Sequence, residues 1–410
     1  MIQRDLAPIL QDSARKWPSV TLTGSRQSGK TTLCRALFPS HAYTSLEAPD
    51  VRAFAEEDPR AFLAQFDSGA ILDEVQRVPE LLSYLQELID NDSSPGRWIL
   101  TGSQNFALLH SISQSLAGRT AVHNLHPLTR GETIRFSEYP TTLDEALVAG
   151  SYPRIFDRRL NPADWFSSYV ATYIERDVRS ITQVIDLPTF QRFASLCAGR
   201  TAQLLNFSSL ASDCGVSQPT ARAWLGILET HFLVFRLPAF YSNLRKRLVK
   251  MPKLHFYDTG LVCWLLGIRT ADQLRTHPLR GAIFESWMVS EIAKHRTNAG
   301  ITQGLSFYRD RHGSEIDLII QDSTECRLLD AKSSSTPSSS LFGGTKRVQN
   351  QLTQSGKQFP ISVVYGGDKL QFRGIDSLVP WEKLHEYDWT TASVELEAMT
   401  VQHDKRKSSS

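Results

Sequence analysis

A glycine-rich segment near the start of the chain carries its clearest chemical signal. The segment reads, in order, Gly24, Ser25, Arg26, Gln27, Ser28, Gly29, Lys30, Thr31 and Thr32. Its glycines and its Lys-Thr pair have the spacing of a phosphate-binding loop, whose backbone N–H groups point at phosphate oxygens. Lys30 would reach the β- and γ-phosphates, and the Thr31 hydroxyl would hold Mg²⁺. We therefore predict that these residues bind ATP and Mg²⁺.

Two acidic residues follow an apolar pair at the point where another strand is expected to end. Ile71 and Leu72 precede Asp73 and Glu74. Asp73 would bind Mg²⁺ through water, and Glu74 would orient and activate the attacking water as a general base. Alone, such a pair more often caps a helix than performs catalysis. Beside a phosphate-binding loop, we interpret it as catalytic.

Hydroxyl groups and an arginine complete the expected nucleotide site. The segment from Trp98 to Thr101 has the pattern of a strand, and Thr101 or Ser103 would sense the γ-phosphate unless they only form a polar strand end. ATP hydrolysis generally uses a positive charge near the γ-phosphate, often supplied by a neighbouring subunit. The candidates are Arg119 and, within the loop, Arg26. For Arg119 a purely structural ion pair is the alternative.

Alternating strand and helix patterns surround these residues and would position them. Strands are expected at 20–23, 42–46 and 98–101, with another that ends at 71–74. Helices are expected at 31–37, 49–66 and 79–90. This alternation predicts an α/β fold with a parallel sheet through about residue 130.

Several longer stretches resemble one family. They are GSRQSGKTTL, LDEVQRVPELL, ILTGSQNF, SLAGRT, LHPLTRGE, GSYPRIF at 150–156, YVATYIERDVRSI at 169–181, KLHFYDTGL at 253–261 and GAIFESWMVSEI at 281–292. Together they are similar to the AAA-type ATPases of archaea and bacteria that carry a DUF4143 C-terminal region. The resemblance extends over residues 2–335 and implies ATP binding and ATPase activity. It does not imply a particular cellular process.

The middle of the chain has the spacing of a helix-turn-helix at 204–235. Ser208 and Ser217 would cap its two helices, and Gly215 would form the turn. The second helix would bury Ala221, Trp224, Leu225 and Leu228 and expose Gln218, Thr220 and Arg222. A strand after residue 232 would complete a winged helix, which can bind double-stranded DNA with phosphate contacts from the basic run Arg245–Lys253. A module that only packs domains together is the alternative.

Four residues near the C-terminus resemble the core of PD-(D/E)xK nucleases. Asp317 lies in the segment SEIDLII, and Asp330 and Lys332 lie in DAK. Residues two apart in a strand share a face, so Asp330 points the same way as Lys332, and Glu315 the same way as Asp317. Asp317 and Asp330 would hold Mg²⁺, Lys332 would polarise water and Glu285 would complete the cluster. The alternative is an inherited core in which Lys332 only neutralises two acids.

Composition excludes some classes and bounds the domain organisation. The chain has 410 residues, of which 41% are hydrophobic, and 45 basic against 43 acidic residues exclude a polybasic coat protein. We expect an ATPase domain at 1–135, a helical region with a winged-helix-like module at 136–270, a nuclease-like domain at 271–375 and a partly disordered extension at 376–410. Five cysteines without metal-like spacing indicate reduced thiols. The start lacks a signal-peptide core and the longest apolar run, 261–268, is too short to span a bilayer, so we expect a cytoplasmic protein without membrane contact.

These patterns support three functional hypotheses. The first is a Mg²⁺-dependent ATPase whose hydrolysis rearranges the attached helical and nuclease-like domains. The second is an ATP-switched DNA-binding protein, and the third is an ATP-gated, metal-dependent nuclease. Double-stranded DNA, a protein client and further copies of the chain are the partner hypotheses. The sequence does not decide among them.

Overall fold

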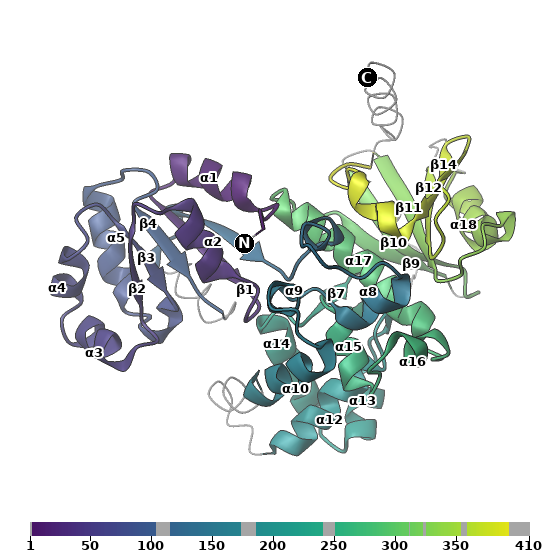
Figure 1. Ribbon diagram of the computed structural model, residues 1–410, viewed down its shortest axis with the longest axis horizontal. Helices are drawn as coiled ribbons and strands as arrows, with labels where there is room; N and C mark the ends of the chain where they lie inside the picture. The colour runs from purple at the N-terminus through teal and green to yellow at the C-terminus, as the bar shows by residue number, and fades with distance from the viewer. Residues whose placement is uncertain are drawn as a thin grey trace.

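The computed structural model describes residues 2–103, 115–173, 186–240, 251–310, 312–322, 325–353 and 359–392. The strands of these residues form three sheets of five, six and three strands. Figure 1 shows an N-terminal domain on one side, a C-terminal domain on the other and a helical middle region below and between them. The candidate nucleotide site lies where the N-terminal domain meets the middle region.

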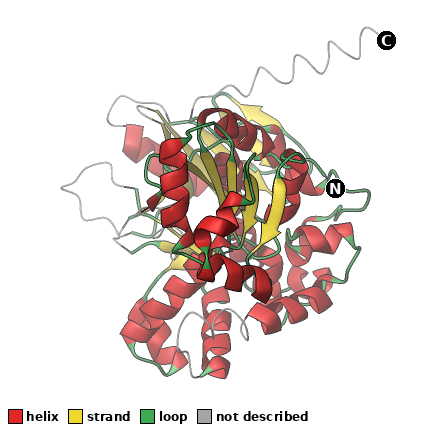
Figure 2. Cartoon of the chain, turned by 90° about the vertical axis from the view of Figure 1, so that its left-hand side faces the viewer, coloured by secondary structure: helices red, strands yellow, loops and turns green. Residues whose placement is uncertain are grey.

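The N-terminal domain is a parallel sheet covered by helices on both faces (Figure 2). Its strands, in the spatial order β2-β3-β4-β1-β5, are β1 (Ser19–Gly24), β2 (Ala42–Ser45), β3 (Ala70–Asp73), β4 (Trp98–Thr101) and β5 (Thr120–Leu125). Its helices are α1 (Ala7–Lys16), α2 (Lys30–Leu37), α3 (Pro49–Glu57), α4 (Pro59–Ala64) and α5 (Leu81–Asn91), with a 3₁₀ turn η1 at Val75–Arg77. The central strands β1, β3 and β4 are buried along their whole length, as sheets covered on both faces require. The predicted parallel α/β sheet is therefore confirmed.

One predicted helix of this domain is wrong in detail. The acidic stretch 49–66 forms two helices rather than one, because Pro59 cannot continue the first. Asp58 precedes the proline and its side chain accepts a hydrogen bond from the Ala61 N–H, which caps the second helix.

The middle region consists mainly of short helices around a small antiparallel sheet, ordered β6-β8-β7. Its helices are α7 (Arg130–Thr133), α8 (Leu143–Ala149), α9 (Pro153–Asp157), α10 (Pro162–Tyr173), α12 (Leu187–Ala198), α13 (Phe207–Cys214), α14 (Gln218–Thr230), α15 (Thr259–Leu265) and α16 (Ala271–Arg275). Its strands are β6 (Gln203–Leu204), β7 (Val234–Leu237) and β8 (Lys253–Phe256).

Helices α13 and α14 are the two helices predicted for the helix-turn-helix. Gly215 forms the turn with φ of 76°, and Ser217 caps α14 as expected. The predicted cap of the first helix is wrong, because Asn206, not Ser208, accepts the N–H groups of the first turn. The expected stripe of α14 is buried and consists of Ala221, Trp224, Leu225 and Leu228.

The C-terminal domain is a mixed sheet in the order β13-β14-β12-β11-β10-β9, with two helices against it. The elements are α17 (Arg280–Asn298), β9 (Leu305–Arg309), β10 (Glu315–Asp322), β11 (Glu325–Lys332), η3 (Ser339–Phe342), α18 (Gly343–Thr353), β12 (Ile361–Tyr365), β13 (Gln371–Arg373), β14 (Asp376–Pro380) and η4 (Trp381–Glu386). Strand β14 lies inside this sheet, so the domain extends beyond the expected boundary at residue 375. Residues 393–410 of the expected extension lie outside the described residues.

Helix α17 joins the parts of the molecule. It packs against β8 of the middle region, against β10 and β11 of the C-terminal domain, and near β5 of the N-terminal domain. Figure 1 shows it crossing the centre of the molecule. Its buried side chains include Phe284, Met288 and Ile292, which belong to one apolar core shared by the middle and C-terminal parts.

Candidate functional site

The phosphate-binding loop connects the end of β1 to the start of α2. Gly24 ends the strand with φ of 145°, and a Cβ at this position would collide with the Leu125 carbonyl of the neighbouring strand. Gly29 precedes the helix with φ of 96°, a conformation that glycine adopts without steric cost. Lys30 is the first residue of α2. The two glycines of the motif are therefore required by the backbone path of the loop.

Lys30 is buried against its own loop. Its Nζ donates hydrogen bonds to the carbonyl oxygens of Gly24 and Ser25, both at 2.9 Å. Burial lowers the pKa of Lys30 to about 8, and the nearby carboxylates of Glu74 and Asp73 only partly oppose this. The ammonium is thus held at the loop by backbone oxygens, at the place where phosphate oxygens would be its stronger partners.

The lowered pKa of Lys30 predicts an unusual pH dependence of ATP binding. ATP binds the ammonium form of Lys30 and so raises the pKa of this group. Above pH 8, where Lys30 of the free protein is largely deprotonated, ATP binding therefore requires the uptake of a proton. We expect the Kd for ATP to rise by up to about tenfold per pH unit above pH 8, whereas an ordinary lysine would show no change below about pH 10. Titration with a fluorescent ATP analogue from pH 7 to pH 10 measures this. The residual binding of Lys30→Ala should lack this rise.

Asp73 ends β3 and contacts the phosphate-binding loop directly. Its Oδ2 accepts hydrogen bonds from Thr31 Oγ1 and from the Tyr43 hydroxyl, both at 2.9 Å. Its Oδ1 accepts one from Thr101 at the end of β4, the strand that lies between β3 and β1. The two residues proposed as Mg²⁺ ligands, Thr31 and Asp73, are therefore neighbours. Thr101 contacts this carboxylate and is buried, so it supports Asp73 and does not face the pocket.

Glu74 lies one residue beyond the strand in a left-handed conformation, with φ of 58°. This turn separates its side chain from that of Asp73 and directs it to the pocket. Its Oε2 accepts hydrogen bonds from Ser103 Oγ, at 3.1 Å, and from the Gln76 amide. Ser103 thus contacts the candidate base as well as the pocket.

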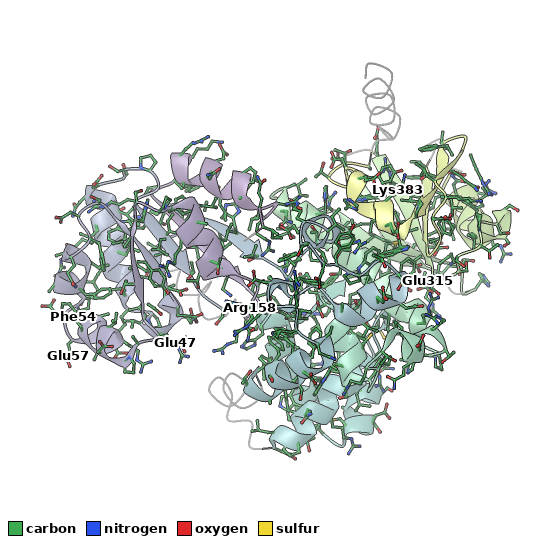
Figure 3. The ribbon with its side chains drawn as sticks, viewed as in Figure 1. Glu47, Phe54, Glu57, Arg158, Glu315 and Lys383 are labelled. Atoms are coloured by element: carbon green, nitrogen blue, oxygen red, sulfur yellow. The ribbon has the colours of Figure 1, made fainter. Side chains whose placement is uncertain are left out.

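A cavity of about 600 Å³ lies beside the phosphate-binding loop and extends to the middle region. The N-terminal domain lines it with Arg4, Arg26, Gln27, Gly29, Lys30, Thr31, Thr32, Glu47, Glu74 and Ser103. The middle region contributes Arg154 and Arg158, which are exposed on and beside α9. Figure 3 places Arg158 on the side of the middle region that faces the N-terminal domain. Neither arginine was predicted as a site residue from the sequence, although Arg154 lies in the segment GSYPRIF that resembles the family.

Arg119 lies at the other edge of the sheet. It precedes β5, and its carbonyl accepts from the N–H of Ser19, where β1 begins. The six-residue strand β1 separates this edge from Gly24 by about 16 Å. The Arg119 guanidinium forms an ion pair with Asp90 at 2.6 Å. Arg119 therefore does not reach the loop of its own subunit, and a role at the γ-phosphate of a neighbouring subunit stays a prediction.

Comparisons with known proteins assign three segments of the chain to families. Residues 16–134 match a family described as an AAA domain, residues 280–384 a domain of unknown function (DUF4143), and residues 140–272 another (DUF8612). The uncharacterized proteins Rv2008c of Mycobacterium tuberculosis and Mb2031c of Mycobacterium bovis are each 31% identical to the chain over 369 residues, which cover 89% of this chain and 80% of theirs. The chain belongs to the AAA-type ATPases that carry a DUF4143 region. A solved structure, the Walker-type ATPase PABY2304 of Pyrococcus abyssi, covers 65% of the chain and 96% of its own at 15% identity and a TM-score of 0.43.

The DUF4143 region of the chain contains a second polar cavity, of about 730 Å³. Glu285 of α17, Glu315 and Asp317 of β10, and Asp330 and Lys332 of β11 all line it. Lys332 Nζ lies 2.8 Å from Asp330 Oδ2, and Asp317 Oδ2 accepts the Ala331 N–H at 2.9 Å. The four residues predicted from the sequence are thus assembled, and Glu315 joins them.

One further residue enters this cluster from the middle region. Lys253 of β8 is only 1% exposed, and its Nζ lies 2.6 Å from Glu285 Oε1 and also binds Glu315. Burial alone would lower the pKa of Lys253, but Glu285, Asp317 and Glu315 raise it above its usual value. The prediction that Lys253 contacts nucleic-acid phosphates is therefore wrong. The rest of the basic run, including Arg245, Lys246 and Arg247, lies outside the described residues.

The outer face of α14 carries few cationic groups. Gln218 and Arg222 are exposed, as predicted, and the Arg222 guanidinium lies 4.3 Å from the centre of the Phe207 ring. The Thr220 hydroxyl is 2.7 Å from that of Ser217 and is partly buried. This face offers one guanidinium and one amide to a partner.

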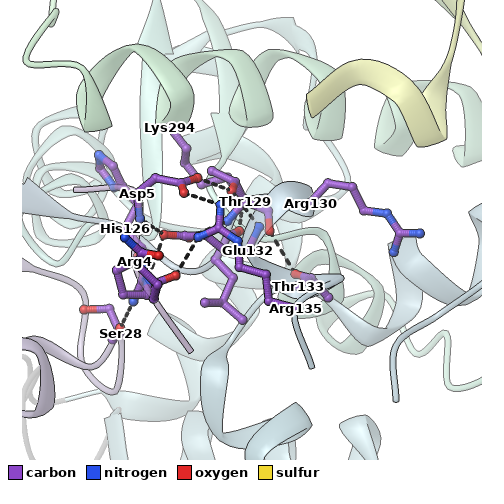
Figure 4. Close-up of polar contacts among 12 residues, drawn as sticks. Arg4, Asp5, Ser28, His126, Thr129, Arg130, Glu132, Thr133, Arg135 and Lys294 are labelled. Carbon is purple, nitrogen blue, oxygen red and sulfur yellow. Dashed lines mark hydrogen bonds and ion pairs between the residues drawn. The ribbon is translucent and has the colours of Figure 1, made fainter. Parts of the chain in front are cut away.

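A buried arginine links the phosphate-binding loop to the start of the middle region (Figure 4). Arg4 Nη1 donates to the Ser28 carbonyl at 2.6 Å, and Nη2 to the His126 carbonyl at 2.8 Å. Its Nε lies 2.9 Å from Oε1 of Glu132, which is fully buried. Glu132 is also the third residue of α7 and forms a capping box with the N-cap Thr129, so the ion pair of Arg4 connects the loop to the start of this helix.

The same polar cluster continues to α17. Lys294 Nζ donates to the Leu128 carbonyl at 2.7 Å and pairs with Glu291 at 2.6 Å. Glu291 in turn accepts the Arg130 N–H at 2.6 Å. The connection between the AAA domain and the middle region is therefore held by side chains of the helix that also carries Glu285.

The structure also bears on the cysteines and on membrane-spanning helices. All five cysteines lie in the described part of the chain, where they are buried and form no disulfide. Within the described ranges, no helix combines the length and apolar character that crossing a membrane requires.

Proposed function

We propose that the protein is a Mg²⁺-dependent ATPase that uses Lys30, Thr31, Asp73 and Glu74. The observation that carries the proposal is the 2.9 Å hydrogen bond between Thr31 and Asp73, beside Lys30 and with Glu74 facing the same cavity. Hydroxyl and carboxylate oxygens are the protein ligands that Mg²⁺ prefers, so this pair fits the ion. Bound Mg²⁺ would neutralise charge on the phosphates.

Each residue has a distinct task in this proposal. Lys30 exchanges the carbonyls of Gly24 and Ser25 for phosphate oxygens, which binds and orients ATP. Glu74 accepts a proton from the attacking water, and Ser103 and Gln76 hold its carboxylate in position. Asp73 is held in position by hydrogen bonds from Thr101 and Tyr43.

The arginines of α9 suggest how ATP would affect the domain arrangement. Arg154 and Arg158 line the cavity from the middle region, and the phosphates would attract both across the domain boundary. ATP binding would draw the middle region towards the loop, and hydrolysis would release it. This supports a coupling of ATP turnover to movement of the attached domains in the cytoplasm.

Phosphate release from ATP, measured with Mg²⁺ and with or without double-stranded DNA, tests the proposal. Wild type should hydrolyse ATP, and Lys30→Ala should lose turnover by at least about 10²-fold because the cation on the phosphates is removed. Arg119→Ala should retain turnover in dilute, monomeric protein. A Lys30→Ala variant as active as wild type would contradict the proposal.

DNA-coupled switching is a second candidate, supported by helices α13 and α14, which have the turn at Gly215 and the Ser217 cap predicted for a helix-turn-helix. Turnover stimulated by DNA, with DNA affinity that falls steeply with salt and with Arg222→Ala, would favour it. Turnover that is indifferent to DNA would favour a protein client. The assembled residues Glu285, Asp317, Asp330 and Lys332 support a metal-dependent nuclease as a third candidate, for which Asp317→Ala is the test.

A further inference from the structure

The acidic cluster of the DUF4143 region contains an ammonium group at its centre. The carboxylate oxygens of Glu285, Glu315 and Asp317 lie within 4.8 Å of one another, which is the arrangement of a metal-binding group. Lys253 Nζ is 2.6 Å from Glu285, contacts Glu315 and is 3.7 Å from Asp317. All three carboxylates therefore face the same cation, and that cation belongs to the protein.

The position of Lys253 follows from the fold rather than from a flexible side chain. Strand β8 pairs with β7 and β6 in the middle region and packs against α17. Lys253 is the first residue of this strand, and its Nζ lies 5.5 Å from the centre of the Phe307 ring of β9. The middle region thus places a lysine among three carboxylates of the C-terminal domain.

An ammonium group and a divalent cation exclude each other at this cluster. They would use the same carboxylate oxygens, and two cations at such a distance in a buried site repel strongly. Two other cations that line the pocket have different partners: Lys332 pairs with Asp330, and Arg309 Nη1 lies 3.2 Å from Glu315 Oε2, whereas Lys253 binds Oε1 of the same carboxylate.

We propose that Lys253 is the resident cation of this cluster, so that the folded chain binds no divalent metal there, and that metal enters only when the Lys253 ammonium is removed from the cluster. The middle region, through Lys253 of β8, then blocks metal binding by the carboxylates of the DUF4143 region. The inference does not depend on ATPase activity, and it goes beyond the nuclease hypothesis because it names the group that keeps the site free of metal.

Mn²⁺ binding to nucleotide-free, full-length protein tests the proposal. All proteins carry Asp73→Asn, which removes the carboxylate near the phosphate-binding loop. The protein with Asp73→Asn alone should show no change in Tm with Mn²⁺. Adding Lys253→Met should let saturating Mn²⁺ raise the Tm by about 3 °C or more. The gain should disappear in Lys253→Met/Asp317→Asn. Lys332→Met is the matched control, since it removes a pocket lysine but leaves Lys253 in the cluster, and it should gain nothing.

The opposite results are equally clear. Asp317-dependent Mn²⁺ binding by protein that retains Lys253, detected as loss of the free Mn²⁺ paramagnetic resonance signal, would overturn the proposal even if Lys253→Met does not fold. A folded Lys253→Met variant that binds no Mn²⁺ would also overturn it. A Lys253→Met variant that folds only when Mn²⁺ is present would support it, because the metal would then replace the missing charge.

Discussion

Replacing Glu74 with glutamine is expected to lower kcat for ATP hydrolysis by about 10²–10⁴-fold while ATP remains bound. The amide cannot accept the proton of the attacking water, yet it keeps the size of the carboxylate and its contacts with Ser103 and Gln76. Lys30, Thr31 and Asp73 are unchanged, so affinity for ATP should stay within a few fold. Single-turnover phosphate release and binding of a fluorescent ATP analogue measure the two quantities separately.

Glu47→Gln is the matched control for this variant. Glu47 lines the same cavity and forms a 3.8 Å ion pair with Arg77, but it is not one of the acids that follow β3. It should hydrolyse ATP at nearly the wild-type rate. Hydrolysis by Glu74→Gln at the wild-type rate would remove Glu74 from the role of general base.

Arg4→Met is expected to destabilise the AAA domain by about 3–5 kcal/mol. The substitution leaves the buried carboxylate of Glu132 without its cation, and it leaves the Ser28 and His126 carbonyls without a donor. Because Ser28 belongs to the phosphate-binding loop, ATP affinity should fall as well. Urea unfolding followed by the fluorescence of Trp98, with the other tryptophans replaced, measures the effect on this domain.

Two further variants test whether the loss of stability in Arg4→Met comes from the unpaired buried charge of Glu132. Arg135→Met removes an arginine that pairs with Asp5 nearer the surface, and it should cost less than about 1 kcal/mol. Adding Glu132→Gln to Arg4→Met should recover part of the lost stability, since the unpaired charge is then absent. Equal effects of Arg4→Met and Arg135→Met would show that burial of the pair contributes little.

Features that depend on residues close together in the chain could be predicted from the sequence. The phosphate-binding loop needs a strand, two glycines and a helix start within a dozen residues, and all of these can be recognised along the chain. The parallel sheet followed from strand and helix alternation. The contact between Thr31 and Asp73 could also be expected, because the carboxyl ends of parallel strands meet at one edge of a sheet.

Contacts between domains could not be predicted in this way. Lys253 stands in a run of basic residues, and a pattern of that kind is typical of an exposed surface that binds phosphate. Its partners Glu285, Glu315 and Asp317 are 32 to 64 residues away, and only the packing of β8 against α17 brings them together. Arg154 and Arg158 likewise line the cavity beside the phosphate-binding loop only because the middle region packs next to the N-terminal domain. Charge pairing over such separations has no local signature.

Helix α17 imposes a strict constraint on length and phase. Glu285 and Lys294 are nine residues apart, which on an α-helix corresponds to about 13.5 Å along the axis and two and a half turns. One residue therefore faces the acidic cluster while the other faces the connection to the AAA domain, on opposite sides. An insertion or deletion of a single residue between them would rotate one end by about 100° relative to the other. Core substitutions that keep side-chain size preserve this phase, whereas any change of length destroys it.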